Sequence, residues 1–249
     1  DTDRSRGLGD VYKRQEQGTG FVTLDGLRTD LDGHVTIREN GILYDVDYIH
    51  GQKTGFFLDQ KYNRRAAAQL AQGKHVLDCF THTGAFGLNC AAAGAASVLS
   101  VDVSEDALTT ARHNAALNGL QDRVEYLCAD VFDLLTKLAE QKRGAYDYII
   151  LDPPAFTKTR SAVEGALRGY KEINLRGMKL TRDGGFFITC SCSQHVTPDL
   201  FRGMLLEAQK DAHVQLRQIE WRTQGRDHPI LLASPETQYL KCGIFQVFK

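Results

Sequence analysis

Four aspartates carry the clearest chemical signal in the sequence, because each lies at the end of an apolar run that predicts a buried strand. The runs are residues 75–79, 97–102, 124–130 and 146–152, and their acids are Asp78, Asp102, Asp130 and Asp152. Helical patterns separate the runs, so we expect a parallel sheet whose carboxyl edge brings the four carboxylates together. One acid at a strand end is a weak signal, whereas four in succession are a strong one.

The turn after the first of these strands has the composition of a ligand-binding loop. Thr81, Thr83 and Gly84 precede a helix that opens near Ala85. Such a turn brings backbone N–H groups and a helix N-terminus to one crevice. The sequence has neither the dinucleotide pattern G-x-G-x-x-G nor a P-loop at this turn.

The strand-end acids indicate which ligand the crevice takes. Asp78 would repel a pyrophosphate but would attract the ammonium of an amino-acid-like ligand. We therefore expect S-adenosylmethionine, with Asp102 binding both ribose hydroxyls and Asp130 accepting from the adenine amino group.

A pair of cysteines ends the apolar run that we expect to form the fifth parallel strand. Cys190 and Cys192 are two residues apart, so they share one face of that strand. One interpretation makes both of them small buried hydrophobes. The other makes one a nucleophile: a thiolate that adds to carbon 6 of a pyrimidine turns carbon 5 into a nucleophile, and Asp152 near ring nitrogen 3 stabilises the charge. The sequence identifies no base for the hydrogen on carbon 5.

The rest of the chain predicts an α/β fold in which strands alternate with helices. An Asn-Gly pair at residues 40–41 between two alternating runs predicts an additional β-hairpin over residues 35–47. We expect helices over 66–72, 104–118, 131–142 and 198–212, a polar segment over 157–181, and strands over 185–190, 214–221 and 240–248.

Composition excludes several classes of protein. The net charge of −1 over 249 residues gives no global field for nucleic acid, and no apolar run reaches the roughly 18 residues of a membrane span. The six cysteines include no C-x-x-C pair, so we expect reduced thiols in a cytoplasmic protein, without a metal site or a membrane segment. Residues 158–183 are locally basic, with seven Lys/Arg against three Asp/Glu. They are either an RNA-facing segment, in which Tyr170 stacks a base, or a solvated helix face with Tyr170 in the core.

Three segments make up the expected domain organisation. Residues 1–15 have no periodicity and resemble translated sequencing-adapter sequence, so we expect a non-native leader and a missing natural N-terminus. Residues 16–60 form an accessory hairpin region and a connector, which either serves the site or places Phe56 and Phe57 in the core. Residues 61–249 form the S-adenosylmethionine-dependent methyltransferase domain.

Nine motifs in order, which extend from about residue 35 to the end, give the sequence a specific resemblance to one family. It resembles the class I methyltransferases that make 5-methylcytosine in large-subunit ribosomal RNA, the RlmI type. The motifs are residues 55–60, 76–86, 102–108, 130–132, 152–156, 169–174, 190–193, 227–229 and 239–241.

The resemblance implies a fold, a cofactor, a substrate and a set of site residues. It implies a Rossmann-like, mostly parallel seven-stranded sheet with an antiparallel last strand, S-adenosylmethionine as methyl donor and large-subunit ribosomal RNA as substrate. It also implies Cys192 as nucleophile, with Asp152 beside it. The implied cofactor residues are Gln60, Asp78, Phe80, Thr83, Gly84, Asp102, Val103, Asp130, Val131, Asp152 and Pro153. Family members carry an N-terminal RNA-binding PUA domain that this sequence lacks, so we expect cofactor binding with weak RNA binding. A homodimer stays an open alternative.

Two other functions fit the same residues. An amino-group methyltransferase would also use an acid-Pro-Pro turn such as Asp152-Pro-Pro, but it leaves the two cysteines idle. A methyltransferase-like fold can also serve as a non-catalytic RNA-binding module. Cofactor binding without methyl transfer to any RNA would favour the latter.

Overall fold

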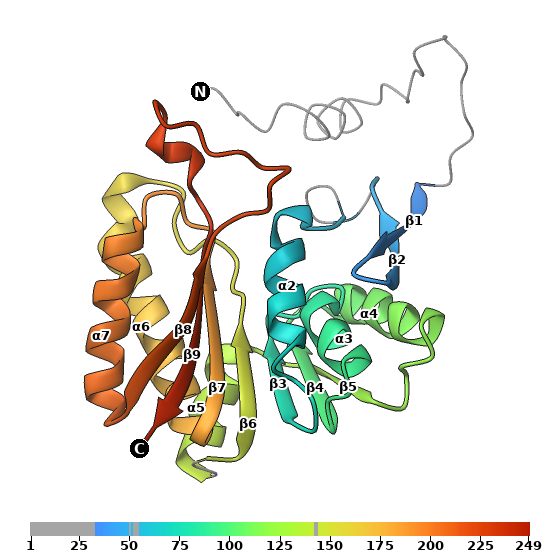
Figure 1. Ribbon diagram of the computed structural model, residues 1–249, viewed down its shortest axis with the longest axis horizontal. Coiled ribbons are helices and arrows are strands. Elements are labelled where there is room, and N and C mark those ends of the chain that lie inside the picture. Colours follow the sequence, from blue (N-terminus) through green and yellow to red (C-terminus); the bar gives the residue numbers. More distant parts are fainter. Residues whose placement is uncertain (1–32, 50, 52–54, 142–143) are drawn as a thin grey trace. The chain divides into compact units, whose positions relative to one another are not determined.

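The computed structural model describes residues 33–49, 51, 55–141 and 144–249 (Figure 1). The chain divides into two compact units, with the boundary between Leu58 and Asp59. The leader expected at residues 1–15 lies outside the described residues, and the expected domain organisation stays a prediction. Among the described residues, no helix is both long enough and apolar enough to cross a membrane.

The first unit contains the predicted β-hairpin. Strands β1 (His34–Glu39) and β2 (Ile42–Asp47) pair antiparallel, with Glu39 opposite Ile42. The two residues that join them, Asn40 and Gly41, have φ angles of 53° and 88°. Two left-handed residues are what a two-residue hairpin turn needs, and Asn-Gly adopts them at little cost. The β-hairpin predicted from the Asn-Gly pair is therefore confirmed.

The second unit is built on a seven-stranded sheet in the order β5-β4-β3-β6-β7-β9-β8. The first five strands of this sheet are parallel, and β9 runs antiparallel to both of its neighbours, which confirms the expected fold class. The chain order reverses between β3 and β6, and ligands bind at such a switch point. The strands are β3 (His75–Cys79), β4 (Ser97–Asp102), β5 (Val124–Cys128), β6 (Tyr146–Leu151), β7 (Thr181–Ser191), β8 (Gln215–Arg222) and β9 (Lys241–Phe248).

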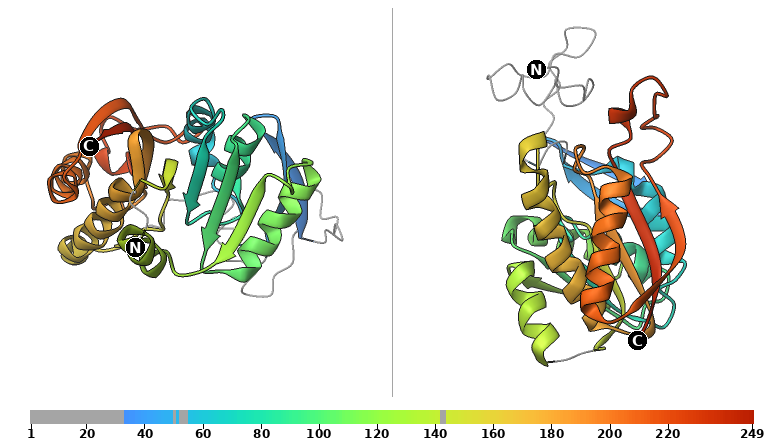
Figure 2. Two further views of the ribbon diagram at one scale, coloured as in Figure 1. Left: turned by 90° about the horizontal axis from the view of Figure 1, so that it is seen from below. Right: turned by 90° about the vertical axis from the view of Figure 1, so that its left-hand side faces the viewer.

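Helices cover both faces of this sheet (Figures 1 and 2). Helices α5 (Val131–Gln141), α6 (Val163–Leu180) and α7 (Pro198–Ala212) share one hydrophobic cluster with Leu77 of β3. Helices α2 (Lys61–Ala68), α3 (Ala85–Ala92) and α4 (Glu105–Leu117) cover the other face. The next residue of β3, Asp78, accepts from the backbone of α3, as the alternation of side chains along a strand requires.

Three elements illustrate how the structure differs from the sequence-based expectation. Helix α2 begins at Lys61 rather than at residue 66, because its polar first turn, which buries Asn63 and Arg64, hides the helical pattern. The polar segment over 157–181 contains the 18-residue helix α6, whose buried positions recur every three or four residues. Strand β5 ends at Cys128, two residues before Asp130.

Candidate active site at the carboxyl edge of the sheet

The turn between β3 and α3 has an unusual backbone. Phe80, His82 and Gly84 have φ angles of 62°, 51° and 85°, and two of the three are not glycine. Non-glycine residues with positive φ cost free energy and cluster at functional sites. The His82 N–H donates to Asp102 Oδ2 over 2.8 Å, which fixes the turn to the end of β4.

Asp78 lies beneath this turn, and its buried carboxyl has hydrogen-bond partners at one of its two oxygens. Its Oδ2 accepts from Thr81 Oγ1 at 2.5 Å and from the Gly87 N–H at 2.8 Å. Its Oδ1 is buried and has no hydrogen-bond partner among the described residues, and neither has Thr83 Oγ1. Burial raises the pKa of Asp78 to about 6, although the hydrogen bonds act in the opposite direction. An unsatisfied buried acceptor suits a cationic ligand group, so these residues fit the ammonium of S-adenosylmethionine.

Asp102 ends β4, as predicted, and is held by backbone donors. Its Oδ2 accepts from His82 and its Oδ1 accepts from the Ser104 N–H at 3.0 Å. Each carboxylate oxygen has a second lone pair for a ligand hydroxyl. The neighbouring Val103 has 70% of its surface exposed, so an apolar side chain lies open to solvent beside the acid.

Asp130 is exposed and already has a structural role. Its Oδ1 accepts from the N–H groups of Phe132 and Asp133 in the first turn of α5, which is how a capping carboxylate satisfies a helix N-terminus. Val131 is buried at the start of that helix. Among the described residues, no hydrogen bond joins Asp130 to the other three strand-end acids, so its contact with adenine stays a prediction.

Asp152 directly follows β6 and is tied to Gln60. Gln60 Nε2 donates to Asp152 Oδ1 at 2.8 Å, and Gln60 Oε1 accepts from Asn63 Nδ2 at 2.7 Å. Burial, with a further contribution from the Asp59 carboxylate, raises the pKa of Asp152 to about 7. Near neutral pH this carboxyl therefore exists in both protonation states. Pro153, the next residue, is buried.

The two strand-end cysteines differ in their surroundings. Cys190 lies within β7 opposite Cys242, both are buried, and burial raises the pKa of the Cys190 thiol well above its usual range. Cys192 is partly exposed. The expectation that both lie on the strand is wrong for Cys192, because β7 ends at Ser191. All six cysteines are described, and no disulfide joins them.

A buried lysine lies beside Cys192. Lys241 is 1% exposed, and its Nζ donates to the carbonyl oxygens of Ser193 and Tyr239 at 2.8 Å each. In the described part of the chain it has no carboxylate partner. Burial lowers its pKa to about 8, while the attraction of Cys192 acts in the opposite direction. No role for Lys241 follows from the sequence alone, although a lysine at the start of an apolar strand is the signal that could have found it.

The basic segment belongs largely to solvated helix surface. Lys171 of α6 pairs with Asp211 at 2.8 Å, and Arg182, which lies on β7 beyond the helix, pairs with Asp147 at 2.7 Å. Tyr170 is fully buried, so it fills the core rather than stacking a base. The described residues contain no cluster of three or more His, Cys, Asp or Glu side chains that could hold a metal ion.

Comparisons with solved structures identify the same fold. A putative S-adenosylmethionine-dependent methyltransferase from Streptococcus mutans has a TM-score of 0.78 at 24% identity, over 88% of this chain and 57% of that chain. P. horikoshii TYW2 in complex with MeSAdo has a TM-score of 0.66 at 16% identity, over 97% of this chain and 83% of that chain.

Comparisons of sequence identify relatives and a family. A protein from Shewanella denitrificans named ribosomal RNA large subunit methyltransferase I is 49% identical over 96% of this chain, and its namesake from Photobacterium profundum is 46% identical over 83%. The chain spans 60% of the former and 52% of the latter. The model of the S-adenosylmethionine-dependent methyltransferase family matches residues 22–229. Because this model matches most of the chain, and because the carboxyl edge of the sheet fits the ammonium of S-adenosylmethionine, the chain belongs to the S-adenosylmethionine-dependent methyltransferases.

Proposed function

We propose that the protein methylates carbon 5 of a cytosine in large-subunit ribosomal RNA. The observation that carries the proposal is the position of Cys192, a partly exposed thiol just beyond β7, at the sheet edge that also bears Asp152. The printed names of the curated relatives support a ribosomal RNA substrate. An amino-group transfer would leave Cys192 and the lysine beside it without a role.

The strand-end residues would hold the methyl donor. Bound S-adenosylmethionine supplies a methyl group that its positively charged sulfur activates. Asp78 would bind its ammonium, Asp102 its ribose hydroxyls and Asp130 its adenine amino group. We assign the remaining contacts to Gln60, Phe80, Thr83, Gly84, Val103, Val131, Asp152 and Pro153.

Cys192 and Asp152 would activate the pyrimidine. The thiolate adds to carbon 6 and forms a carbon–sulfur bond, while the electron pair of the 5,6 double bond moves toward carbon 5 and the ring. Asp152, with its pKa raised to about 7, can donate a hydrogen bond to ring nitrogen 3 and stabilise the added charge. Carbon 5 would then take the methyl group from the donor as the bond between that group and the donor sulfur breaks. Transfer of the proton on carbon 5 to a base would re-form the double bond and expel the thiolate.

The identity of the labelled nucleoside tests this proposal. The chain, alone and joined to the N-terminal segment of the Shewanella denitrificans relative, is incubated with methyl-labelled S-adenosylmethionine and unmodified large-subunit ribosomal RNA. We expect label in 5-methylcytidine after digestion of the RNA. Label in a methylated adenosine or guanosine would overturn the thiol mechanism and assign the chemistry to Asp152-Pro-Pro.

Cys192→Ala separates catalysis from cofactor binding. We expect loss of methyl transfer with an unchanged dissociation constant for S-adenosylmethionine, because the thiol takes no part in holding the donor. Cys190→Ala is the matched control, since that thiol is buried within the strand. Full activity of Cys192→Ala would eliminate the covalent mechanism. Cofactor binding without transfer to any RNA by the unaltered chain would favour a non-catalytic RNA-binding module.

A further inference from the structure

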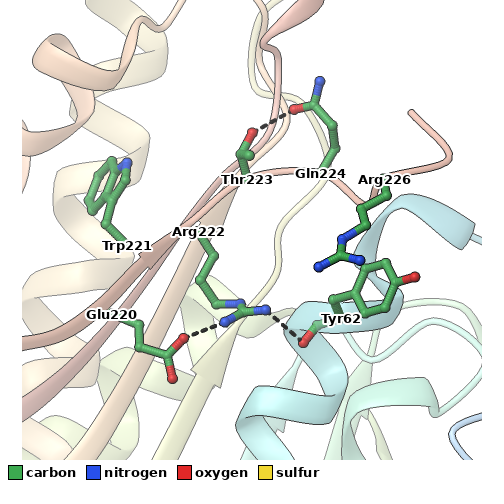
Figure 3. Close-up of a pocket in the computed structure, with 7 residues that line it drawn as sticks. All are labelled: Tyr62, Glu220, Trp221, Arg222, Thr223, Gln224 and Arg226. Carbon is green, nitrogen blue, oxygen red and sulfur yellow. Dashed lines mark hydrogen bonds and ion pairs between the residues drawn. The ribbon is translucent and has the colours of Figure 1, made fainter. Parts of the chain in front are cut away.

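A groove of about 570 Å³ lies between the end of β8 and the first turn of α2 (Figure 3). Tyr62 of α2 forms part of one wall, and Trp221 and Arg222 of β8 form part of the other. Arg226 joins them from the segment that follows β8. The volume falls within the roughly 300–1,000 Å³ of small-ligand sites. None of these four residues takes part in the chemistry proposed for the thiol.

The two arginines of the groove differ in how they are held. Arg222 is fixed: its Nε donates to Asn63 Oδ1 at 3.0 Å, its Nη2 to the Tyr62 carbonyl at 3.4 Å, and its Nη1 to the Glu220 carboxylate. Arg226 is exposed and forms no hydrogen bond or ion pair with the described residues. Its guanidinium can therefore bind an anion without first breaking an existing pair.

The groove is connected to the active-site acid by a chain of hydrogen bonds. Arg222 donates to Asn63, Asn63 donates to Gln60, and Gln60 donates to Asp152. The Gly225 N–H also donates to the Asp59 carbonyl at 2.8 Å, which anchors the segment that carries Arg226. A short hydrogen-bond network would thus connect a ligand in the groove to Asp152, the residue that contacts the target nucleobase.

Sites that bind single-stranded nucleic acid commonly combine arginine side chains with aromatic rings. Guanidinium groups bind phosphate oxygens, and aromatic faces stack bases. Tyr62 supplies the ring, whereas the Trp221 ring packs against Phe201 of α7 and has the Arg202 guanidinium 4.2 Å from its centre. The cation over the Tyr62 ring is the Lys61 ammonium, 5.7 Å from the ring centre, so a base can stack on Tyr62 without displacing an arginine.

We propose that this groove binds an unpaired nucleotide of the RNA that flanks the target base, with its phosphate on Arg226 and its base against Tyr62. The proposal rests on the proposed function, because it names the RNA subsite of the same reaction. It assigns the groove to single-stranded RNA rather than to duplex RNA, whose stacked bases cannot reach a side-chain ring.

Equilibrium binding of labelled RNA tests the assignment. The probes are a single-stranded oligoribonucleotide of mixed sequence and the same strand in a perfect duplex. Arg226→Ala should weaken single-strand binding severalfold and reduce the slope of log K against log salt by about 0.7 for one lost phosphate contact. Tyr62→Ala should weaken binding at least fivefold, whereas Tyr62→Phe should retain it, because stacking uses the ring and not the hydroxyl.

Arg217→Ala is the matched control. Arg217 is an exposed arginine of the same strand that lies over the Phe248 ring and outside the groove, so its loss changes the net charge equally. We expect unchanged RNA affinity for this variant and an unchanged dissociation constant for S-adenosylmethionine in all four variants. Equal losses for Arg226→Ala and Arg217→Ala would overturn the groove assignment, as would equal binding of duplex, or no binding of single strand by the unaltered chain.

Methylation assays separate failure of the groove from failure of the proposed function. If the unaltered chain makes 5-methylcytidine and Arg226→Ala binds and methylates RNA equally well, the groove assignment is wrong and the function stands. If groove variants lose RNA affinity but label appears in another nucleoside, the groove stands and the cytosine assignment is wrong.

Discussion

Asp78 combines burial with an acceptor atom that has no partner among the described residues. Because burial raises its pKa to about 6, the apo protein carries the neutral acid below that pH and the carboxylate above it. Only the carboxylate attracts an ammonium. Burial of this carboxylate therefore costs free energy in the apo protein, and a cationic ligand can offset that cost when it binds.

The affinity for S-adenosylmethionine should depend on pH through this carboxyl. We expect the dissociation constant to be nearly constant above pH 7 and to rise about tenfold per pH unit below the pKa, because binding must then expel a proton. Isothermal titration calorimetry between pH 4.5 and 8 measures it. Asp78→Asn should bind weakly at every pH and lose the dependence. A flat profile for the unaltered chain would remove Asp78 from the ammonium site.

Lys241 should influence the reactivity of Cys192. An ammonium close to a thiolate stabilises it, so Lys241→Met should shift the pH midpoint of Cys192 alkylation by iodoacetamide upward, by about one unit. Cys128 is the exposed thiol that would interfere, so the measurement uses a Cys128→Ser background. A purely structural role would lower the melting temperature and leave the alkylation midpoint where it was.

At the scale of single elements, a strand or helix was predicted correctly where its sequence pattern shows directly which of its residues are buried. Strands β3 and β4 were predicted with the bounds that they have, because buried parallel strands are short apolar runs. Helix α6 was expected only as one of two interpretations of a polar segment, because its buried stripe includes Asn174 and Gly177, which are polar or helix-breaking residues. The partner of Lys241 could not be predicted, because Ser193 comes beside it only through the pairing of β7 with β9.

Two glycines of α6 should respond oppositely to the same substitution. A Cβ at Gly177 would lie 2.7 Å from a ring carbon of Phe187, whereas a Cβ at Gly165 would meet nothing closer than 3.8 Å. We expect Gly177→Ala to lower the free energy of unfolding by about 1–3 kcal/mol through overpacking. Gly165→Ala should raise it by at most about 1 kcal/mol through helix propensity. Urea denaturation of both variants measures the two changes in the free energy of unfolding. Equal changes would contradict the close packing of α6 on β7.

At the scale of the whole molecule, the alternation of strands and helices was enough to predict the parallel sheet and the edge at which strand-end acids gather. Asp78, Asp102 and Asp152 come to that edge as the sequence predicts. Asp130 lies outside its strand and caps a helix, and the groove at Arg226 had no sequence signal. Its walls come from α2 and from the end of β8, about 160 residues apart in the chain.

Binding of S-adenosylmethionine should stabilise the folded protein by mass action. At a ligand concentration 100 times the dissociation constant, we expect the free energy of unfolding to rise by about 2.7 kcal/mol. Asp102→Ala should remove most of this gain by removing the ribose contact, while Asp106→Ala, an acid in the first turn of α4, should retain it. Thermal melts with and without ligand measure the effect. An unchanged gain in Asp102→Ala would count against the assigned ribose contact.

The position of β9 in the sheet has a consequence for synthesis on the ribosome. Both of its neighbours, β7 and β8, precede it in the chain, so a nascent polypeptide that has released them still has an open slot between them. Tyr239 and Lys241 arrive with the strand that fills this slot, and until then Cys192 lacks its buried amine. The turns to which we assign the methyl donor emerge much earlier. On the proposed chemistry, methyl transfer would therefore begin only when translation has passed the last strand of the sheet.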